Sequence, residues 1–214
     1  MKIVDLTHPI SPNMPVYPGT KPPVITTGCS IDETGFLEKI ITFYSHTGTH
    51  IDAPAHLIKD HNTLDMLAIE HFYGPALMLN FDHCAIQTIG VKELEPYHES
   101  IMDIEFLLLH TGWSRYWGTE NYFSNYPVLS IEAAQWVNSF GLKGFGLDTI
   151  SADTGDTQDY QIHKALLQNN TIIIENLTNL SDLPLNQFAF SCFPLSFQQA
   201  DGSPVRAVAY IQDF

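Results

Sequence analysis

The chain has 214 residues, of which 44% are hydrophobic, and 24 acidic residues against 9 Lys and Arg give it a formal net charge of −15. This length and this hydrophobic share predict one domain, over residues 1–214, with room for a sizeable core. An acidic surface of this strength repels phosphate backbones and anionic lipids, so the charge argues against nucleic-acid and membrane partners.

Two strands separated by a proline-rich loop are predicted first. Residues 1–6 form a short apolar stretch that is typical of a strand. The loop that follows, residues 7–23, contains six prolines and therefore few backbone donors, so we expect it at the surface as the lip of a pocket. The β-type run Lys39–Ser45 predicts the second strand.

Strands and helices then alternate along the chain. Phe106–His110 has the continuous apolar character of a strand that is buried on both faces. Ser130 is a typical N-cap for a helix that ends before Gly141. The elements expected in this region are strands over Pro75–Phe81, Phe106–His110, Gly144–Asp148 and Thr171–Glu175, and helices over Ser130–Val137 and Tyr160–Gln168.

Two more strands are predicted near the C-terminus, over Phe188–Phe197 and Val205–Ile211. The pair Asp201-Gly202 between them is a hairpin signal, although the connection is longer than two residues. Strand-rich ends around an alternating middle predict an α/β fold. We expect a single domain with a mixed β-sheet or barrel-like core flanked by helices.

The three cysteines, Cys29, Cys84 and Cys192, are odd in number, far apart and free of C-x-x-C spacing. A disulfide framework is therefore not expected, and a reducing compartment is the default. The first residues lack the long apolar region of a secretory signal, and no apolar stretch approaches the length of a membrane helix. Together these features predict a cytoplasmic protein.

The segment Ser45–His56 packs three histidines and one aspartate into twelve residues. Imidazole and carboxylate groups hold zinc, manganese or iron, and catalytic zinc sites keep three such ligands and one open position. His50 and Asp52 are two residues apart, so in an extended chain they point to the same side. Gly48 permits a sharp backbone path that brings His46 back toward them. A lone histidine is usually a core or surface residue, but this density predicts a metal site.

A second pair of candidate ligands lies in the C-terminal half. Glu175 ends a run of three isoleucines, where burial of an unpaired carboxylate would cost several kcal/mol. His163 lies on the predicted helix before that strand, and a helix-loop-strand unit can bring both side chains to one end of the sheet. The alternative is an exposed glutamate at a strand end and a histidine on a helix rim. The upstream cluster favours a second half-site.

Other catalytic signals are absent. The chain contains no G-x-S-x-G elbow, no glycine-rich phosphate loop and no papain-like cysteine context. The acidic, turn-rich segment Asp148–Asp159 does not match the calcium loop pattern. We interpret Asp148 as a residue near an active site because it ends a strand, and Asp153, Asp156 and Asp159 as loop or helix-capping residues.

The segment His46–His56 resembles the H-x-G-T-H-x-D-x-P-x-H signature of the metal-dependent cyclase superfamily, which includes bacterial kynurenine formamidase (arylformamidase) and isatin hydrolase. The likeness runs nearly end to end. Further blocks in family order are Asp5-Leu6-Thr7 with Tyr17-Pro18-Gly19, Thr111-Gly112-Trp113, Gly146–Asp153, His163 with Glu175-Asn176-Leu177, and Gly202–Ala207.

The resemblance implies a role for each matching residue. His46, His50 and Asp52 would bind a first metal ion, and in two-metal members Asp52 would bridge to a second ion held by His163 and Glu175. His56 would be the general acid and base. Tyr17 stands where the formamidases carry a tryptophan that contacts substrate, and Gly19-Thr20 replaces their usual Gly-Asp. These two departures concern the substrate and leave the metal chemistry unchanged.

The leading hypothesis is a hydrolase that cleaves an amide-type carbonyl, in an aryl formamide such as N-formylkynurenine or in a related cyclic amide, with metal-activated water. The cofactor expected is Zn²⁺, one or two per subunit, with Mn²⁺ as the alternative. A hydrolase or lyase of the same family that acts on another small carbonyl compound is a second possibility. A non-catalytic metal- or ligand-binding protein is a third, against which the intact His56 argues. The resemblance also implies a homodimer or homotetramer.

Overall fold

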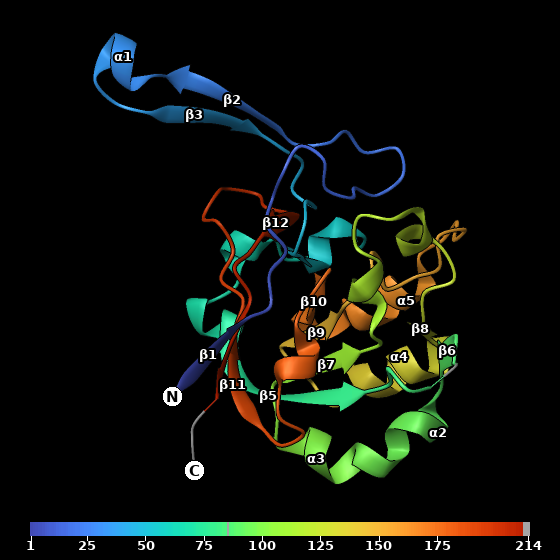
Figure 1. Ribbon diagram of the computed structural model, residues 1–214. Coiled ribbons are helices and arrows are strands. Elements are labelled where there is room, and N and C mark those ends of the chain that lie inside the picture. The colour runs from blue at the N-terminus through green and yellow to red at the C-terminus, as the bar shows by residue number, and fades with distance from the viewer. Residues whose placement is uncertain (85, 212–214) are drawn as a thin grey trace.

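A nine-stranded mixed sheet forms the body of the protein in the computed structural model, which describes residues 1–84 and 86–211 (Figure 1). In spatial order its strands are β1 (Lys2–Asp5), β13 (Val208–Ile211), β11 (Phe188–Ser191), β5 (Tyr73–Asn80), β7 (Phe106–His110), β9 (Gly144–Leu147), β10 (Ile172–Glu175), β4 (His50–Asp52) and β12 (Gly202–Pro204). The four central strands, β5, β7, β9 and β10, run parallel, and the outer pairs are antiparallel.

The sheet separates two apolar cores because successive side chains of a strand point to opposite faces. On β5, Leu77 and Leu79 belong to the core on the helical side, whereas Ala76 and Met78 belong to the core inside the curl of the sheet. The helical side carries α2 (Val91–Leu94), α3 (His98–Met102), α4 (Ile131–Asn138) and α5 (Gln161–Leu166), with the small sheet of β6 (Thr88–Ile89) and β8 (Val128–Leu129). The expected α/β class with a mixed sheet and flanking helices is confirmed.

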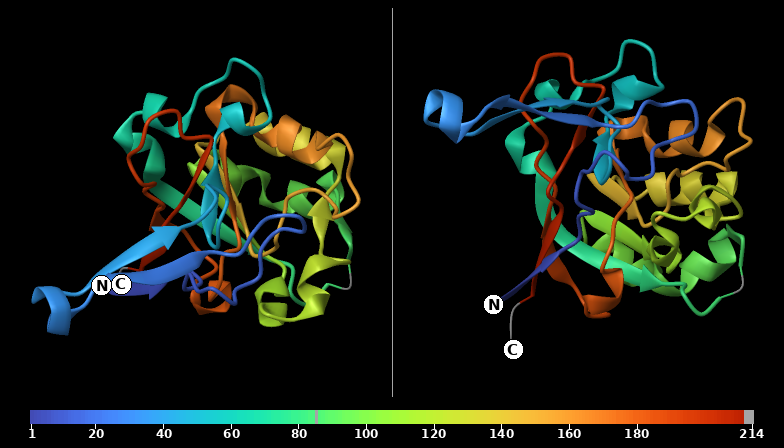
Figure 2. Two further views of the ribbon diagram at one scale, coloured as in Figure 1. Left: turned by 90° about the horizontal axis from the view of Figure 1, so that it is seen from above. Right: turned by 45° about the horizontal axis from the view of Figure 1, so that its top comes forward.

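A hairpin arm leaves the body between the proline-rich loop and the histidine-rich segment. It consists of β2 (Val24–Cys29), β3 (Glu38–Thr42) and, at its tip, the short helix α1 (Ile31–Thr34). Both views in Figure 2 show the arm projecting away from the nine-stranded sheet. Every residue of β3 is exposed, and α1 buries none of its residues. The strand expected over Lys39–Ser45 therefore exists, but it is shorter and lies outside the body.

The C-terminal hairpin prediction was wrong in part. The two expected strands do pair antiparallel, as β11 and β13, but β11 ends at Ser191 and β13 begins at Val208. The pair Asp201-Gly202 is not their turn. The chain between them crosses to the far edge of the sheet, where β12 pairs with β4 and the carbonyl of Asp201 accepts from Ala53 N at 2.9 Å. Since β11 already pairs with β13 on one side and β5 on the other, the connection instead contributes β12 to the opposite edge of the sheet.

The remaining central elements match their predictions within a few residues. The side chain of Ser130 caps α4 by accepting from Ala133 N, and all five residues of β7 are buried, as expected. Among the residues that the structure describes, no helix is long and apolar enough to cross a bilayer.

Candidate metal centre

Two neighbouring antiparallel strands, β4 and β10, provide three of the candidate ligands. In their register His50 lies opposite Glu175, and Asp52 lies opposite Ile173. His50 and Asp52 share one face of β4, while Ile51 between them points into the core inside the curl. The prediction that His50 and Asp52 point to the same side is confirmed.

The loop before β4 brings His46 to the same aspartate. Gly48 has a φ of +67°, a conformation that favours glycine, and it turns the chain back on itself. His46 Nδ1 lies 2.6 Å from Asp52 Oδ1, and His50 Nε2 lies 3.2 Å from that same oxygen. Two imidazole nitrogens therefore converge on one carboxylate oxygen.

The other oxygen of Asp52 faces the second half of the cluster. His163, on α5, has its Nε2 3.5 Å from Asp52 Oδ2 and 3.1 Å from Glu175 Oε1. The second oxygen of Glu175 lies 3.5 Å from His50 Nε2. Glu175 Oε1 also accepts from Ala152 N at 2.9 Å, which fixes the carboxylate. The structure thus brings His163 and Glu175 together with the upstream cluster, and Asp52 lies between the two halves.

Each of the three histidines has a hydrogen-bond acceptor on the ring nitrogen that faces away from Asp52. The acceptor is the carbonyl of Gly48 for His50, at 2.8 Å, and a carboxylate of Asp153 for His163, at 2.6 Å. For His46 it is Asp201, at 3.0 Å. An acceptor on the outer nitrogen holds a proton there, so the nitrogen that faces Asp52 is the one that can ligate a metal ion, which is the usual arrangement around metal-binding histidines.

The carboxylates control the protonation of the cluster. Burial lowers the pKa of His46, but Asp52 and Asp201 outweigh it and raise that pKa to about 10. Burial likewise opposes a charged His163, yet hydrogen bonds to Asp153, Asp52 and Glu175 raise its pKa well above the usual value. Burial raises the pKa of Asp52, but the histidines overcome this and hold it well below its usual range. In the metal-free protein, protons on His46 and His163 therefore supply the positive charge that a bound divalent cation would bring.

The donor set fits one or two divalent ions. Two groups of three side chains, His46 with Asp52 and His56, and His50 with Asp52 and Glu175, each have ligand atoms within 4.8 Å of one another. Two ligands on one zinc ion, at about 2.0–2.1 Å from it, stand roughly 3.3 Å apart in tetrahedral geometry. Mixed imidazole and carboxylate donors at this spacing suit zinc and manganese.

His56 lies beside the cluster, in the short 3₁₀ turn Pro54–His56 that follows β4. Its ring is 3.9 Å from the ring of His46, and its Nδ1 is 3.7 Å from Asp201 Oδ2. Burial lowers the pKa of His56. A neutral imidazole next to the donor cluster can accept a proton from a reacting group.

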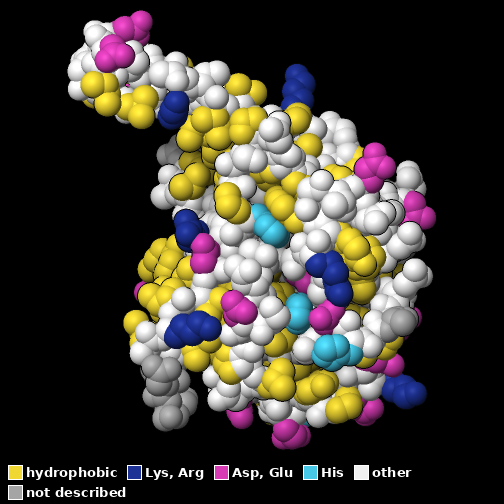
Figure 3. Space-filling model, in the orientation of Figure 1, with side chains coloured by type: hydrophobic (Ala, Val, Ile, Leu, Met, Phe, Trp, Pro, Cys, Tyr) yellow, Lys and Arg dark blue, Asp and Glu magenta, His cyan; other side chains and the backbone are white. Residues whose placement is uncertain are grey.

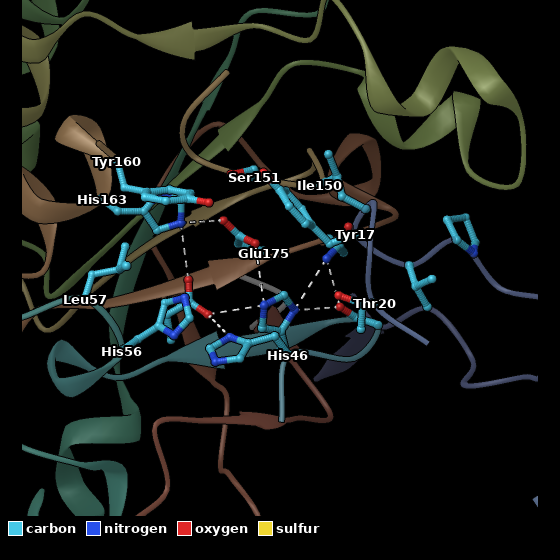
Figure 4. A pocket seen from close by; sticks show the side chains of 16 residues that line it. Tyr17, Thr20, His46, His56, Leu57, Ile150, Ser151, Tyr160, His163 and Glu175 are labelled. Carbon is cyan, nitrogen blue, oxygen red and sulfur yellow. Dashed lines mark hydrogen bonds and ion pairs between the residues drawn. The ribbon is translucent and has the colours of Figure 1, made fainter. Parts of the chain in front are cut away.

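A pocket of about 280 Å³ opens over these side chains (Figure 4). Apart from the cluster, its lining comes from the proline-rich loop and from the segments before and after β4, after β9, before α5 and after β10: Pro15, Val16, Tyr17, Thr20, Gly48, Leu57, Ile150, Ser151, Tyr160 and Asn176. The prediction that the proline-rich loop forms a pocket lip is confirmed. Burial and a hydrogen bond to Tyr160 raise the pKa of Tyr17, so its hydroxyl stays neutral at the mouth of the pocket.

Sequence reasoning missed two carboxylates. Asp153 does cap α5, by accepting from the backbone N–H groups of Ile162 and His163, but it also holds the His163 ring. The sequence indicates Asp201 only as part of a turn. The sequence carries a signal for Asp153, which precedes the helix of a candidate ligand, whereas Asp201 lies 155 residues from its partner His46.

The chain is similar to known proteins in sequence and in fold. A family model described as "Putative cyclase" matches residues 4–154. Kynurenine formamidase of Bacillus cereus is 32% identical over 206 residues, which cover 96% of this chain and 95% of that protein. Isatin hydrolase A from Ralstonia solanacearum superposes with a TM-score of 0.86 at 27% identity, covering 97% of this chain and 91% of that one.

A solved structure described as a predicted metal-dependent hydrolase from Bacillus stearothermophilus gives a TM-score of 0.79 at 27% identity, and the match covers 97% of both chains. The fold and the resemblance inferred from the signature residues are both confirmed.

Proposed function

The chain belongs to the putative cyclase family, and we propose that it is a metal-dependent hydrolase that cleaves an amide-type carbonyl, in an aryl formamide or a cyclic amide. The observation that carries this function is the convergence of imidazole and carboxylate donors on Asp52 beneath an open, largely apolar pocket. The relatives named kynurenine formamidase and isatin hydrolase support a hydrolase acting on non-peptide C–N bonds.

The geometry supports two half-sites. We assign His46, His50 and Asp52 to a first ion, and Asp52, His163 and Glu175 to a second, with Zn²⁺ as the first choice and Mn²⁺ as the second. When bound, such an ion would supply a Lewis acid that makes a water molecule more acidic and polarises the substrate carbonyl.

His56 would move the proton. Because its pKa is lowered by burial, the ring is neutral at neutral pH and can accept a proton from the attacking water. The same ring can then donate that proton to the departing nitrogen, as the leaving group needs one. Tyr17 and the apolar residues of the lip would hold an aryl group against the cluster, so that the carbonyl faces the donors.

Two variants separate metal binding from proton transfer. His50→Ala should lose metal and turnover together, because it removes a buried donor. His56→Ala should keep the metal, while turnover falls about 10²- to 10⁴-fold with loss of the general base. His61→Ala, an exposed histidine five residues farther on, is the matched control and should keep both. Full turnover by His56→Ala would remove His56 from the mechanism.

The substrate class is tested with metal-loaded protein and a panel of aryl formamides, cyclic amides and lactones. Hydrolysis of a formamide or cyclic amide is the expected result. Turnover of lactones alone would point to another small carbonyl compound. Metal binding without turnover of any member would make this a binding protein and would contradict the proposal.

We also propose that the protein is a cytoplasmic homo-oligomer. Its cysteines are free thiols, as a reducing compartment requires. The arm supports a second copy as the partner, since a two-stranded hairpin is marginally stable on its own and this one exposes apolar side chains along its length (Figure 3). Six large ones on the arm and Tyr44, two residues beyond it, are between 52% and 66% exposed: Val24, Ile31, Phe36, Leu37, Ile40, Ile41 and Tyr44.

The exposed apolar area of the arm is large enough for a symmetric dimer. A half-exposed side chain of this size presents roughly 80–100 Å², so covering one arm removes roughly 600 Å² from water. Two arms used reciprocally about a two-fold axis remove about 1,200 Å², which reaches the range of stable interfaces. Sedimentation velocity should therefore show a wild-type oligomer that Ile40→Lys dissociates. Met102→Lys, at an equally exposed apolar position on α3, should not. A monomeric wild type would contradict this proposal.

A further inference from the structure

Asp201 connects two histidines that the mechanism uses for different purposes. Its Oδ2 lies 3.0 Å from Nε2 of His46, a candidate metal ligand, and 3.7 Å from Nδ1 of His56, the candidate general base. One carboxylate oxygen of Asp201 therefore faces a ring nitrogen of each histidine. With 49% of its side chain exposed, Asp201 is far more exposed than the carboxylates of Asp52, Asp153 and Glu175.

The backbone holds Asp201 in this place. Its carbonyl accepts from Ala53 N, and the next residue, Gly202, pairs with Asp52 across β12 and β4. A Cβ on Gly202 would lie 2.5 Å from Cε1 of His46, closer than packed atoms approach. The His46 ring therefore lies against the backbone of β12, with its outer nitrogen directed at Asp201. The contact is a consequence of the sheet register rather than of a flexible loop.

We propose that Asp201 is a positioning residue that orients both imidazoles, with His46 directed to a metal ion through Nδ1 and His56 directed to the reaction through Nε2. This inference rests on the proposed function. It joins the metal site and the proton-transfer group through one carboxylate, a connection that the donor cluster alone does not require.

The physical reasons differ for the two rings. Donation of the Nε2–H of His46 to a carboxylate keeps that proton on Nε2, so a metal ion displaces the proton of Nδ1, the nitrogen that lies 2.6 Å from Asp52. For His56, a carboxylate near Nδ1 favours the tautomer with its proton on Nδ1. Nε2 is then the nitrogen that exchanges protons with the substrate.

The test compares Asp201→Ala and Asp201→Asn with Asp65→Asn. Asp65 belongs to the same neighbourhood, since its carboxylate accepts from Ala200 N, but it touches neither histidine and serves as the control. Zinc affinity is measured by competition with a chromogenic chelator. Asp201→Ala should weaken it 10- to 100-fold, the usual effect of removing a carboxylate behind a ligating histidine. Asp201→Asn should recover part of the loss, because the amide oxygen still accepts from Nε2–H.

At saturating zinc, Asp201→Ala should lower kcat at least tenfold with KM changed less than about twofold, since His56 is misoriented but the pocket is intact. Nitrogen-15 NMR of the zinc-loaded wild type should show His46 protonated on Nε2. Zinc affinity and kcat equal to those of Asp65→Asn would overturn the inference. Because zinc affinity and tautomer need no substrate, they test it even if no substrate in the panel is hydrolysed.

Discussion

The two sides of the donor cluster differ in how they are held. On the buried side, His50, His163 and Glu175 have 5–6% of their side-chain surface exposed and lie on β4, α5 and β10. On the open side, His46, His56 and Asp201 are 22%, 31% and 49% exposed and lie in a loop, in a 3₁₀ turn and just before β12. The buried side is fixed by regular elements, whereas the open side lies on loops and a short turn and is more exposed to solvent.

This difference separates two tasks. Buried donors with fixed tautomers can hold an ion in one place, because sheet register and a capped helix set their geometry. Groups that exchange protons with a substrate must be reached from the pocket, and His56 is on that side. Asp52 belongs to both sides, since one oxygen faces His46 and the other faces His163.

Removing the residue that both sides share should have the largest effect. Asp52→Asn takes away the charge that faces all three candidate histidine ligands, so we expect loss of bound metal and a fall in turnover of more than about 10³-fold. Metal content by elemental analysis and activity on the same preparation measure this. Asp60→Asn, an exposed change of the same kind, should alter neither. Stoichiometric metal in Asp52→Asn would show that the two sides do not depend on their shared carboxylate.

The pH dependence of metal binding should report protons held on both sides. The carboxylates around His46 raise its pKa to about 10, and those around His163 raise its pKa well above the usual value. An ion must displace these protons, so zinc affinity should rise with pH. The expected slope between pH 6.5 and 8.5 is about tenfold per unit for each proton displaced. Apparent Kd values in a non-coordinating buffer provide the measurement, and a flat profile would contradict protonated His46 and His163 in the metal-free protein.

Asp153→Ala tests how the buried side of the cluster is held. It removes the acceptor for His163 Nδ1, so zinc affinity should fall 10- to 100-fold. It also removes the cap of α5, so the metal-free protein should lose about 1 kcal/mol of stability. Asp201→Ala should leave stability within about 0.5 kcal/mol, because that carboxylate is half exposed. Urea unfolding of both variants measures these changes in stability. Equal losses of stability would mean that the two sides of the cluster are held in the same way.

The smallest effect is expected at the lip of the pocket. Tyr17→Phe removes the hydroxyl that hydrogen-bonds with Tyr160 and keeps the ring, so KM should rise about two- to fivefold with kcat nearly unchanged. Steady-state kinetics measure both constants, with Tyr44→Phe, at an exposed tyrosine just after β3, as the control. A fall in kcat of tenfold or more would instead give Tyr17 a part in the chemical step.

Local spacing explains which parts of this molecule could be predicted. His46, His50 and Asp52 lie within seven residues, and the strand and turn geometry of so short a segment can be inferred from Gly48 and from the two-residue period. The buried strands of the parallel centre are equally clear from their apolar runs. His163 and Glu175 needed one further step, the assumption of a helix-loop-strand unit, and the structure brings them together.

Long-range pairings could not be predicted in this way. The three residues of β12, Gly-Ser-Pro, have no β-propensity, so nothing local shows that they pair with β4 and bring Asp201 to His46. The arm is a different case. Ile40 and Ile41 have the composition of a buried strand, but composition does not show whether the burial comes from the same chain, and in this fold both side chains are more than half exposed.

Anomalous diffraction from crystals soaked in zinc tests the central claim most directly, because it locates the ion without reference to activity. We expect a peak in contact with Asp52, between His46 Nδ1 and His50 Nε2, and any second peak between Asp52, His163 and Glu175. A zinc-soaked crystal with these side chains ordered but no peak at Asp52 would contradict a metal centre built on that carboxylate.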